Sequence, residues 1–337
     1  MTGEMEIYDT TIIGAGPVGM FTAFYAGLRS MKVHLVESLP ELGGQLATLY
    51  PEKYIYDIPG FPGEKAKDIV LNLEEQMNRF DVDVSLETNI IGIKRTEDHT
   101  FIIESEKDQI FQTRTIIIAG GNGSFEPKRM KLPNIEEYEG INLHYFVKDI
   151  EHFRDKDVVV FGGGDSAVDW SLMLSDIAAS VTLVHRRDRF RAHESSVREL
   201  KDSRVNLLTP FRPASFEASE KLSSITLKHS REEMEIEVDG DEFICNFGFS
   251  STLGSMKDWG IDIRRNDIMV NSKMETNIEG VYAVGDINSY DGKVKLIATG
   301  FGEAPIAVSS AKVHIDPAAK HQPQHSTSII DEKQGKQ

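Results

Sequence analysis

The sequence has 337 residues, of which 40% are hydrophobic and 27% charged, and its 37 basic and 54 acidic side chains give a formal net charge of −17. This length exceeds one ordinary core and fits two domains. The acidic balance argues against nucleic acid or an anionic membrane as partner, because both attract basic surfaces. No apolar run approaches the roughly 18 residues that span a bilayer. The N-terminus also lacks the basic and apolar regions of a signal peptide, so we expect a cytoplasmic location.

Cys245 is the single cysteine of the chain. An intrachain disulfide, a Cys-x-x-Cys redox pair and a thiolate metal cluster are therefore excluded. The apolar residues around it, 243–247, predict a buried core thiol rather than a reactive one. His185 and His193 are not spaced with further ligands, so we expect no metal centre.

The first nucleotide-binding motif begins with a β-branched stretch at residues 8–13, which predicts a strand. Gly14, Gly16 and Gly19 follow, and a helix is predicted over residues 20–28. In such a motif the first glycine allows a tight turn, the second lets a pyrophosphate approach the backbone, and the third lets helix and strand pack closely. The helix N-terminus offers free N–H groups and a positive dipole end to the phosphates.

Several further landmarks belong to the same predicted site. A second strand at residues 32–36 ends on Glu37, 23 residues after the first glycine, where a carboxylate can accept hydrogen bonds from a ribose diol. The Gly-Gly-Gln turn at residues 43–45 brings backbone close to a ligand, and residues 115–121 form a strand that ends in a glycine turn. Residues 276–286 are an apolar strand ending in Gly-Asp, and this carboxylate suits a ribityl hydroxyl of a flavin or a helix cap.

The same motif occurs a second time, about 148 residues further along the chain. A strand at residues 157–161 leads into Gly162, Gly164 and Ala167, and a helix is predicted over residues 168–177. The repetition predicts a second dinucleotide site with the same strand–turn–helix construction.

The second copy differs from the first in the residue that would meet the ribose. After a strand at residues 181–184, the position matching the first copy's acid is His185, and Arg186, Arg187 and Arg191 follow. Guanidinium groups bind a ribose 2′-phosphate, which a carboxylate would repel. This site is therefore predicted to prefer NADPH to NADH, with a solvated basic loop as the alternative interpretation.

Flavin-type landmarks lie on both sides of the second copy, which indicates that one domain is inserted into the other. We expect an α/β fold of two Rossmann-like, three-layer ββα domains. The FAD-binding domain comprises residues 1–120 and 248–337, with a C-terminal extension at 321–337, and the inserted NADPH-binding domain comprises residues 121–247.

The chain resembles the thioredoxin-reductase-like flavoproteins over nearly its whole length. The shared motifs are residues 14–19, 43–45, 59–62, 162–167, 185–187 and 285–286. Thioredoxin reductases carry a cysteine pair upstream of the second glycine motif, where our register places His144 and Val147. Neither residue can form a disulfide, so dithiol chemistry is not expected.

The sequence is more similar to the thioredoxin-reductase-like ferredoxin–NADP+ reductases, which lack the cysteine pair and have a C-terminal extension. Residues 49–51 and 325–328 support this choice. The resemblance implies that Tyr50 stacks on one flavin face and that His325, from the partner subunit of a homodimer, covers the other. The remaining flavin contacts it implies are Glu37, Gln45, Ile90, Phe125, Asp286 and Thr327.

The activity implied is electron transfer between NADPH and a one-electron carrier such as ferredoxin or flavodoxin, with no side-chain acid or base. Alternatives are an NADPH diaphorase acting on a quinone or free flavin, a flavin monooxygenase or peroxide-forming oxidase, and a redox-sensing module. Because ferredoxins are usually acidic, docking needs a local basic patch. Residues 128–131 or 293–295 are candidates.

Overall fold

A computed structural model describes residues 6–147, 149–322 and 325–327, apart from the side chains of residues 124–126, 250 and 251. The chain forms two compact units. Unit 1 contains residues 1–124 and 251–337, and unit 2 is Phe125–Ser250. The chain crosses between them through β9 (Ser124–Pro127) and β18 (Phe249–Thr252), which pair as a two-stranded sheet.

Unit 1 is built on a seven-stranded sheet in the order β5-β2-β1-β8-β7-β6, in which β21 also pairs with β8. The strands β5, β2, β1, β8 and β21 run parallel, whereas β6, β7 and β8 pair antiparallel. The strands are β1 (Ile7–Ile13), β2 (Val33–Val36), β5 (Val82–Ser85), β6 (Ile90–Arg95), β7 (Phe101–Ser105), β8 (Ile110–Ile118) and β21 (Val281–Ala283).

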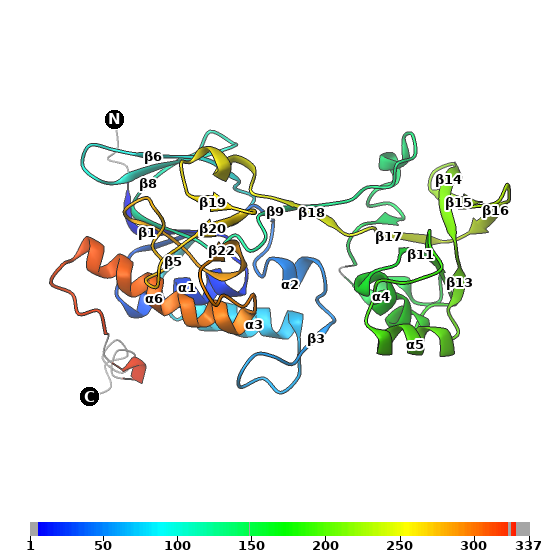
Figure 1. Ribbon diagram of the computed structural model, residues 1–337, viewed down its shortest axis with the longest axis horizontal. Helices are drawn as coiled ribbons and strands as arrows, with labels where there is room; N and C mark the ends of the chain where they lie inside the picture. Colours follow the sequence, from blue (N-terminus) through cyan, green and yellow to red (C-terminus); the bar gives the residue numbers. More distant parts are fainter. Residues whose placement is uncertain (1–5, 148, 323–324, 328–337) are drawn as a thin grey trace. The chain divides into compact units, whose positions relative to one another are not determined.

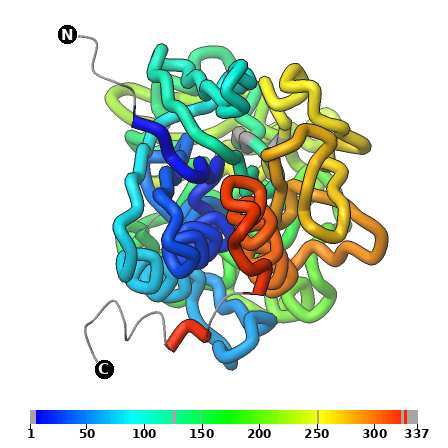
Figure 2. The backbone as a smooth tube through the Cα atoms, turned by 90° about the vertical axis from the view of Figure 1, so that its left-hand side faces the viewer, coloured from blue at the N-terminus to red at the C-terminus, as the bar shows by residue number. Residues whose placement is uncertain are grey.

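Helices cover one face of this sheet, namely α1 (Pro17–Leu28), α3 (Ala66–Met77) and α6 (Ile297–Ile315). Figures 1 and 2 show the N-terminal α1 (blue) beside the C-terminal α6 (orange). Along β1, Ile12 packs into the helical core while Ile13 packs into a second core on the opposite face, as the alternation of a strand requires. Trp259 lies in that second core.

The second core is covered by short elements, which completes three layers. These are the η3 turn (Gly254–Asp258) and the small sheet of β19 (Ile263–Arg264), β20 (Asp267–Met269) and β22 (Asn288–Ser289). Other short elements of unit 1 are α2 (Gln45–Thr48), β3 (Tyr54–Ile55), β4 (Glu64–Lys65) and the turn η4 (Gly285–Ile287).

Unit 2 repeats this layering around a five-stranded parallel sheet in the order β10-β17-β11-β12-β13. Val158 and Val160 pack with the helices, while Val159 and Phe161 pack with an antiparallel sheet on the other face. The parallel strands are β10 (Leu143–His144), β11 (Asp157–Gly162), β12 (Ser180–Val184), β13 (Asn206–Leu208) and β17 (Glu242–Asn246). The covering elements are α4 (Asp165–Ser175), α5 (Glu194–Asp202), β14 (Phe211–Ala218), β15 (Leu222–His229), β16 (Glu235–Asp239) and the turns η1 (Ile135–Tyr138) and η2 (Ile150–Phe153).

The predicted class, two three-layer Rossmann-like domains, is confirmed, and Cys245 is buried as expected. Both motif helices begin earlier than predicted, α1 at Pro17 and α4 at Asp165. The strand expected over residues 276–286 was wrong in length, since the strand comprises Val281–Ala283 alone. The Thr276 hydroxyl bonds to the Val281 carbonyl across the preceding turn, which keeps that segment out of the sheet.

His34 is a buried histidine in β2, inside the sheet of unit 1. Its ring stacks on Tyr8 with centroids 4.7 Å apart, contacts Phe111 at 4.5 Å, and shares a 2.9 Å hydrogen bond between Nε2 and the Ser85 hydroxyl. Burial lowers the pKa of His34 to about 4, although Asp83 opposes the shift. The native protein therefore holds His34 neutral.

This neutral state predicts a pH-dependent loss of stability. The unfolded chain protonates His34 near about pH 6.5, so stability is complete above that pH and falls as the pH drops towards about 4, the native pKa. Between about pH 7.5 and about pH 5, His34 should lower the unfolding free energy of the wild type by about 2 kcal/mol. We expect this contribution to be absent from His34→Gln. Urea unfolding at both pH values measures this, with the exposed His99→Gln as control. An unchanged pH dependence in His34→Gln would contradict it.

Candidate dinucleotide-binding sites

The three glycines of the first motif have different surroundings, and these match the roles that the spacing predicts. A Cβ on Gly14, whose φ is +106°, would lie 2.6 Å from the Ala119 carbonyl oxygen. A Cβ on Gly19 would lie 1.8 Å from the Gly14 carbonyl oxygen, because α1 packs directly on the turn. A Cβ on Gly16 meets nothing within 4 Å. The open side of the turn is thus at Gly16, at the N-terminus of α1, and the free N–H groups of a helix N-terminus favour an anion.

This difference predicts opposite outcomes for two alanine substitutions. Gly19→Ala should prevent folding of unit 1, because its Cβ overlaps backbone. Gly16→Ala should fold normally, since the φ of −67° suits any residue. If FAD binds here as the sequence predicts, the methyl group would occupy the approach of its phosphates and weaken binding by about tenfold or more. Far-UV circular dichroism and flavin absorbance after gel filtration separate the two effects. If Gly16→Ala kept full flavin affinity, the phosphates would have to bind at a position other than Gly16.

Glu37 follows β2, is buried, and holds the glycine turn. Its Oε2 accepts a 2.7 Å hydrogen bond from the Ala15 N–H, and its Oε1 accepts from the Leu39 N–H at 2.9 Å and the Ser38 hydroxyl at 3.1 Å. A carboxylate has about four acceptor sites, so capacity remains for a ribose hydroxyl. Glu37 therefore orients the turn and keeps an acceptor site free.

The Gly-Gly-Gln segment lies against the same turn. The Gly43 N–H donates to the Ala15 carbonyl at 2.9 Å, and a Cβ on Gly44 would lie 3.1 Å from the Gly16 Cα. Gln45 begins α2, with its Nε2 3.4 Å from where a Cβ of Gly121 would be. Residues 43–45, the first motif and the glycine turn after β8 are thus brought together.

Tyr50 and Asp286 interact electrostatically. Burial raises the pKa of Tyr50, and the carboxylates of Asp286 and Asp57 raise it further. Burial likewise raises the pKa of Asp286, against the opposing effect of Lys293 and Lys295. A half-buried carboxylate near a phenol suits recognition of a polyhydroxylated, aromatic ligand.

A buried ion pair at the η4 turn, which contains Asp286, was missed by sequence reasoning. Lys293 and Glu303 contact each other with side chains 4% and 3% exposed. Glu303 accepts from the Gly285 N–H at 2.7 Å, the Asn288 amide at 3.0 Å and the Tyr290 hydroxyl at 2.8 Å, and Lys293 donates to the Gly285 carbonyl at 3.0 Å. Both partners therefore fix the turn that presents Asp286. The signal was a single acid within the apolar helix α6.

The four remaining flavin predictions have less support from geometry. The Ile90 side chain is buried in the second core of unit 1, and its carbonyl accepts from the Ser255 hydroxyl at 3.0 Å. The Phe125 side chain lies outside the described residues. His325 and Thr327 are exposed, on the C-terminal extension.

Unit 2 has a cavity of about 750 Å³ at the carboxyl ends of its parallel strands. The second glycine motif lines it, including Gly162, Gly164 and Ala167. A Cβ on Gly162 would lie 2.5 Å from the Asn246 carbonyl, whereas a Cβ on Gly164 meets nothing within 4 Å. The second motif therefore repeats the first, with its open position at the N-terminus of α4.

His185 packs on this turn and stacks on Phe190 with centroids 5.2 Å apart. A Cβ on Gly163 would lie 2.2 Å from the His185 ring, so this position needs glycine. Burial lowers the pKa of His185, and the neighbouring arginines lower it further. Within the described part of the chain, His185 Nε2 and Asn246 Nδ2 are buried without hydrogen-bond partners, and both residues line the cavity. Such orphaned polar atoms suit a polar ligand.

Basic side chains dominate the cavity, whereas Asp165 is the acid among its lining residues. The predicted Arg186, Arg187 and Arg191 all line it, and the Arg191 N–H donates to the Gly163 carbonyl at 2.6 Å. The basic lining residues are Lys128, Arg129, Lys131, His185, Arg186, Arg187, Arg191 and Arg212.

The two basic patches that the sequence suggested for docking differ in the exposure and surroundings of their lysines and arginine. Residues 128–131 line the cavity of unit 2, where Arg129 also pairs with Glu139. The alternative patch at residues 293–295 was wrong for Lys293, which is buried against Glu303. Lys295 is partly exposed and pairs with Asp267 at 2.7 Å.

Two Rossmann-like units, each with a glycine turn open at a helix N-terminus, define a class of proteins that bind two dinucleotides. The model of the pyridine nucleotide-disulphide oxidoreductase family matches residues 8–311, and the chain belongs to that family. Among the described residues, no helix combines the length and apolar composition that crossing a bilayer needs.

Named relatives and solved structures agree with this membership. The chain is 56% identical to "Ferredoxin--NADP reductase 2" of Oceanobacillus iheyensis over 97% of this chain and 100% of that protein. It is 55% identical to "Ferredoxin--NADP reductase" of Geobacillus thermodenitrificans over 97% and 98%. The solved thioredoxin reductase of Lactococcus lactis is 29% identical, with a TM-score of 0.73, and the match covers 91% of this chain and 99% of that one.

Proposed function

We propose that this protein is a ferredoxin–NADP reductase that binds FAD in unit 1 and NADPH in unit 2. The observation that carries the proposal is the likeness at 55–56% identity, over nearly the full length, to proteins with that name. The paired sites are consistent with it. When bound, FAD and NADPH would supply the electron-transfer chemistry themselves. The proposed reaction therefore needs no side-chain acid or base.

In unit 1, the chain's own groups bind and orient the flavin cofactor. The N-terminus of α1 at Gly16 receives the pyrophosphate, Glu37 accepts from a ribose, and Asp286 accepts from the ribityl chain. Tyr50 offers an aromatic face for the isoalloxazine ring, where stacking contributes roughly 0.5–1.5 kcal/mol beyond area burial. The cradle suits the group because Gly16 is open while its neighbours are tightly packed.

In unit 2, the same construction holds NADPH in the basic cavity. The N-terminus of α4 at Gly164 receives the pyrophosphate, and Arg186, Arg187 and Arg191 bind the 2′-phosphate. The buried Asn246 Nδ2, which lacks a protein partner within the described residues, is available to donate to the ligand.

Other parts of the proposal concern the assembly. By resemblance, the protein forms a cytoplasmic homodimer in which His325 and Thr327 of the extension reach the partner's flavin, and flavodoxin can replace ferredoxin. Removing residues 321–337 should then change the flavin spectrum of the dimer. An unchanged spectrum would remove the extension from the flavin site.

The deciding experiment follows NADPH and NADH oxidation anaerobically with ferredoxin and with a disulfide substrate. We expect a yellow protein that reduces ferredoxin, prefers NADPH and leaves the disulfide intact. Oxidation of NADPH with a quinone or free flavin, but not with ferredoxin, would retain the cofactors and make the protein a diaphorase instead.

A further inference from the structure

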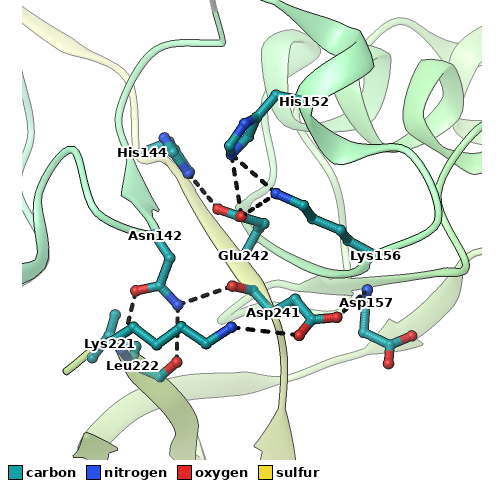
Figure 3. A network of polar contacts seen from close by, with 9 residues as sticks. All are labelled: Asn142, His144, His152, Lys156, Asp157, Lys221, Leu222, Asp241 and Glu242. Atoms are coloured by element: carbon teal, nitrogen blue, oxygen red, sulfur yellow. Dashed lines mark hydrogen bonds and ion pairs between the residues drawn. The ribbon is translucent and has the colours of Figure 1, made fainter. Parts of the chain in front are cut away.

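A cluster of titratable side chains lies at the amino end of the parallel sheet in unit 2, at the opposite end from the basic cavity. Figure 3 shows His144 and His152 directed at the carboxylate of Glu242, with Lys156 beside it. Glu242 is the first residue of β17 and its side chain is 7% exposed. His144 ends β10, His152 lies in the η2 turn and Lys156 immediately precedes β11.

The contacts place three nitrogen atoms around one carboxylate. His144 Nε2 lies 2.6 Å from Glu242 Oε2, His152 Nε2 lies 3.1 Å from Oε1, and Lys156 Nζ lies 2.6 Å from Oε1. Lys156 Nζ also lies 3.3 Å from His152 Nε2. His152 Nε2 cannot at once donate to Glu242 and accept from Lys156, so one of these contacts goes unused as a hydrogen bond.

A divalent metal ion resolves this conflict, because it accepts lone pairs from both imidazoles and the carboxylate. One ligand atom from each of the three residues lies within 4.8 Å of the other two. In a tetrahedral zinc site with Zn–N bonds of about 2.0–2.1 Å, ligand atoms are about 3.4 Å apart. His152 is on a short, half-exposed turn and can close the difference. The two-histidine, one-carboxylate set leaves a fourth position for water.

The ammonium of Lys156 stands where a metal ion would bind beside Glu242, and the exposure of this side chain allows it to leave. Its side chain is 32% exposed. It can therefore swing into solvent when a dication takes its place beside Glu242. The lysine then acts as a competing cation that occupies the site when metal is scarce.

We infer that His144, His152 and Glu242 form a binding site for a divalent transition metal of the zinc type, which Lys156 occupies competitively in the metal-free protein. Sequence reasoning missed the site because 98 residues separate His144 from Glu242. Parallel pairing of β10 with β17 brings them together. The inference is independent of the proposed function, since the site lies at the other end of the sheet from the nucleotide cavity.

The test measures Zn²⁺ binding to untagged, chelator-treated full-length protein by competition with a chromophoric chelator, and Co²⁺ binding by absorption. We expect one Zn²⁺ per chain, weakened tenfold or more by His144→Ala and by His152→Ala. The exposed His99→Ala is the matched control. NADPH affinity, measured by fluorescence, should remain unchanged in both variants and shows that unit 2 is folded.

Lys156→Met separates the metal site from a purely structural ion-pair cluster. Removing the competing cation should tighten Zn²⁺ binding several-fold, while the exposed Lys201→Met leaves it unchanged. Zn²⁺ binding that is absent, that is indifferent to both histidine variants, or that Lys156→Met weakens would each overturn the inference.

Discussion

Replacing Arg186 and Arg187 together by alanine is expected to lower kcat/KM for NADPH by about 100-fold or more and to leave NADH nearly unaffected. Both side chains line the cavity next to the second glycine turn. A 2′-phosphate carries close to two negative charges at neutral pH, and each charge-assisted hydrogen bond to it contributes about 1.5–3 kcal/mol. Because NADH lacks that phosphate, the substitutions remove little that it uses.

The control for this prediction is Arg198→Ala, an exposed arginine on α5 of the same unit. It removes an equal charge from the surface without altering the cavity, so both coenzymes should keep their rates. Steady-state kinetics with each coenzyme, using one artificial electron acceptor, measures the effect. Equal losses for NADPH and NADH in the double variant would mean that the arginines support the fold or the nicotinamide end rather than the 2′-phosphate.

The sequence predicted the elements of both sites where local pattern determines structure. The two glycine motifs fix tight turns whose neighbours are backbone atoms, as at Gly14 and Gly19, so spacing alone carries the geometry. The shift from Glu37 to His185 at matching positions likewise predicted a basic cavity, which the structure contains. Such features depend on residues close together in the chain.

Features that depend on distant residues were not accessible in the same way. Lys293 was assigned to a surface patch because a lysine is usually exposed, and its burial follows from a partner that only the packing of α6 brings near. The cluster around Glu242 depends on strand order in unit 2, which single-sequence periodicity does not reveal. The extent of β21 was likewise decided by hydrogen bonds within the turn that precedes it.

Breaking the buried ion pair of Lys293 and Glu303 is expected to reduce both stability and flavin affinity. In Glu303→Gln the buried ammonium of Lys293 loses the carboxylate that contacts it directly, and we expect the free energy of unfolding to fall by about 3–5 kcal/mol. The displaced Lys293 ammonium should also weaken its 3.0 Å hydrogen bond to the Gly285 carbonyl, so Asp286 is less well placed and FAD affinity should fall roughly tenfold. Urea unfolding and flavin titration of the apoprotein measure the two effects.

The double variant Lys293→Met with Glu303→Gln distinguishes an unpaired charge from simple loss of packing. It removes both charges, and the side-chain amide introduced by Glu303→Gln can still accept from Gly285 and donate to Tyr290, so the double variant should be more stable than Glu303→Gln alone. Glu75→Gln, at an exposed position of α3, is the matched control and should be neutral. If the double variant were no more stable than Glu303→Gln alone, an unpaired Lys293 charge would not be the cause of the loss, and the turn that presents Asp286 would not depend on this pairing.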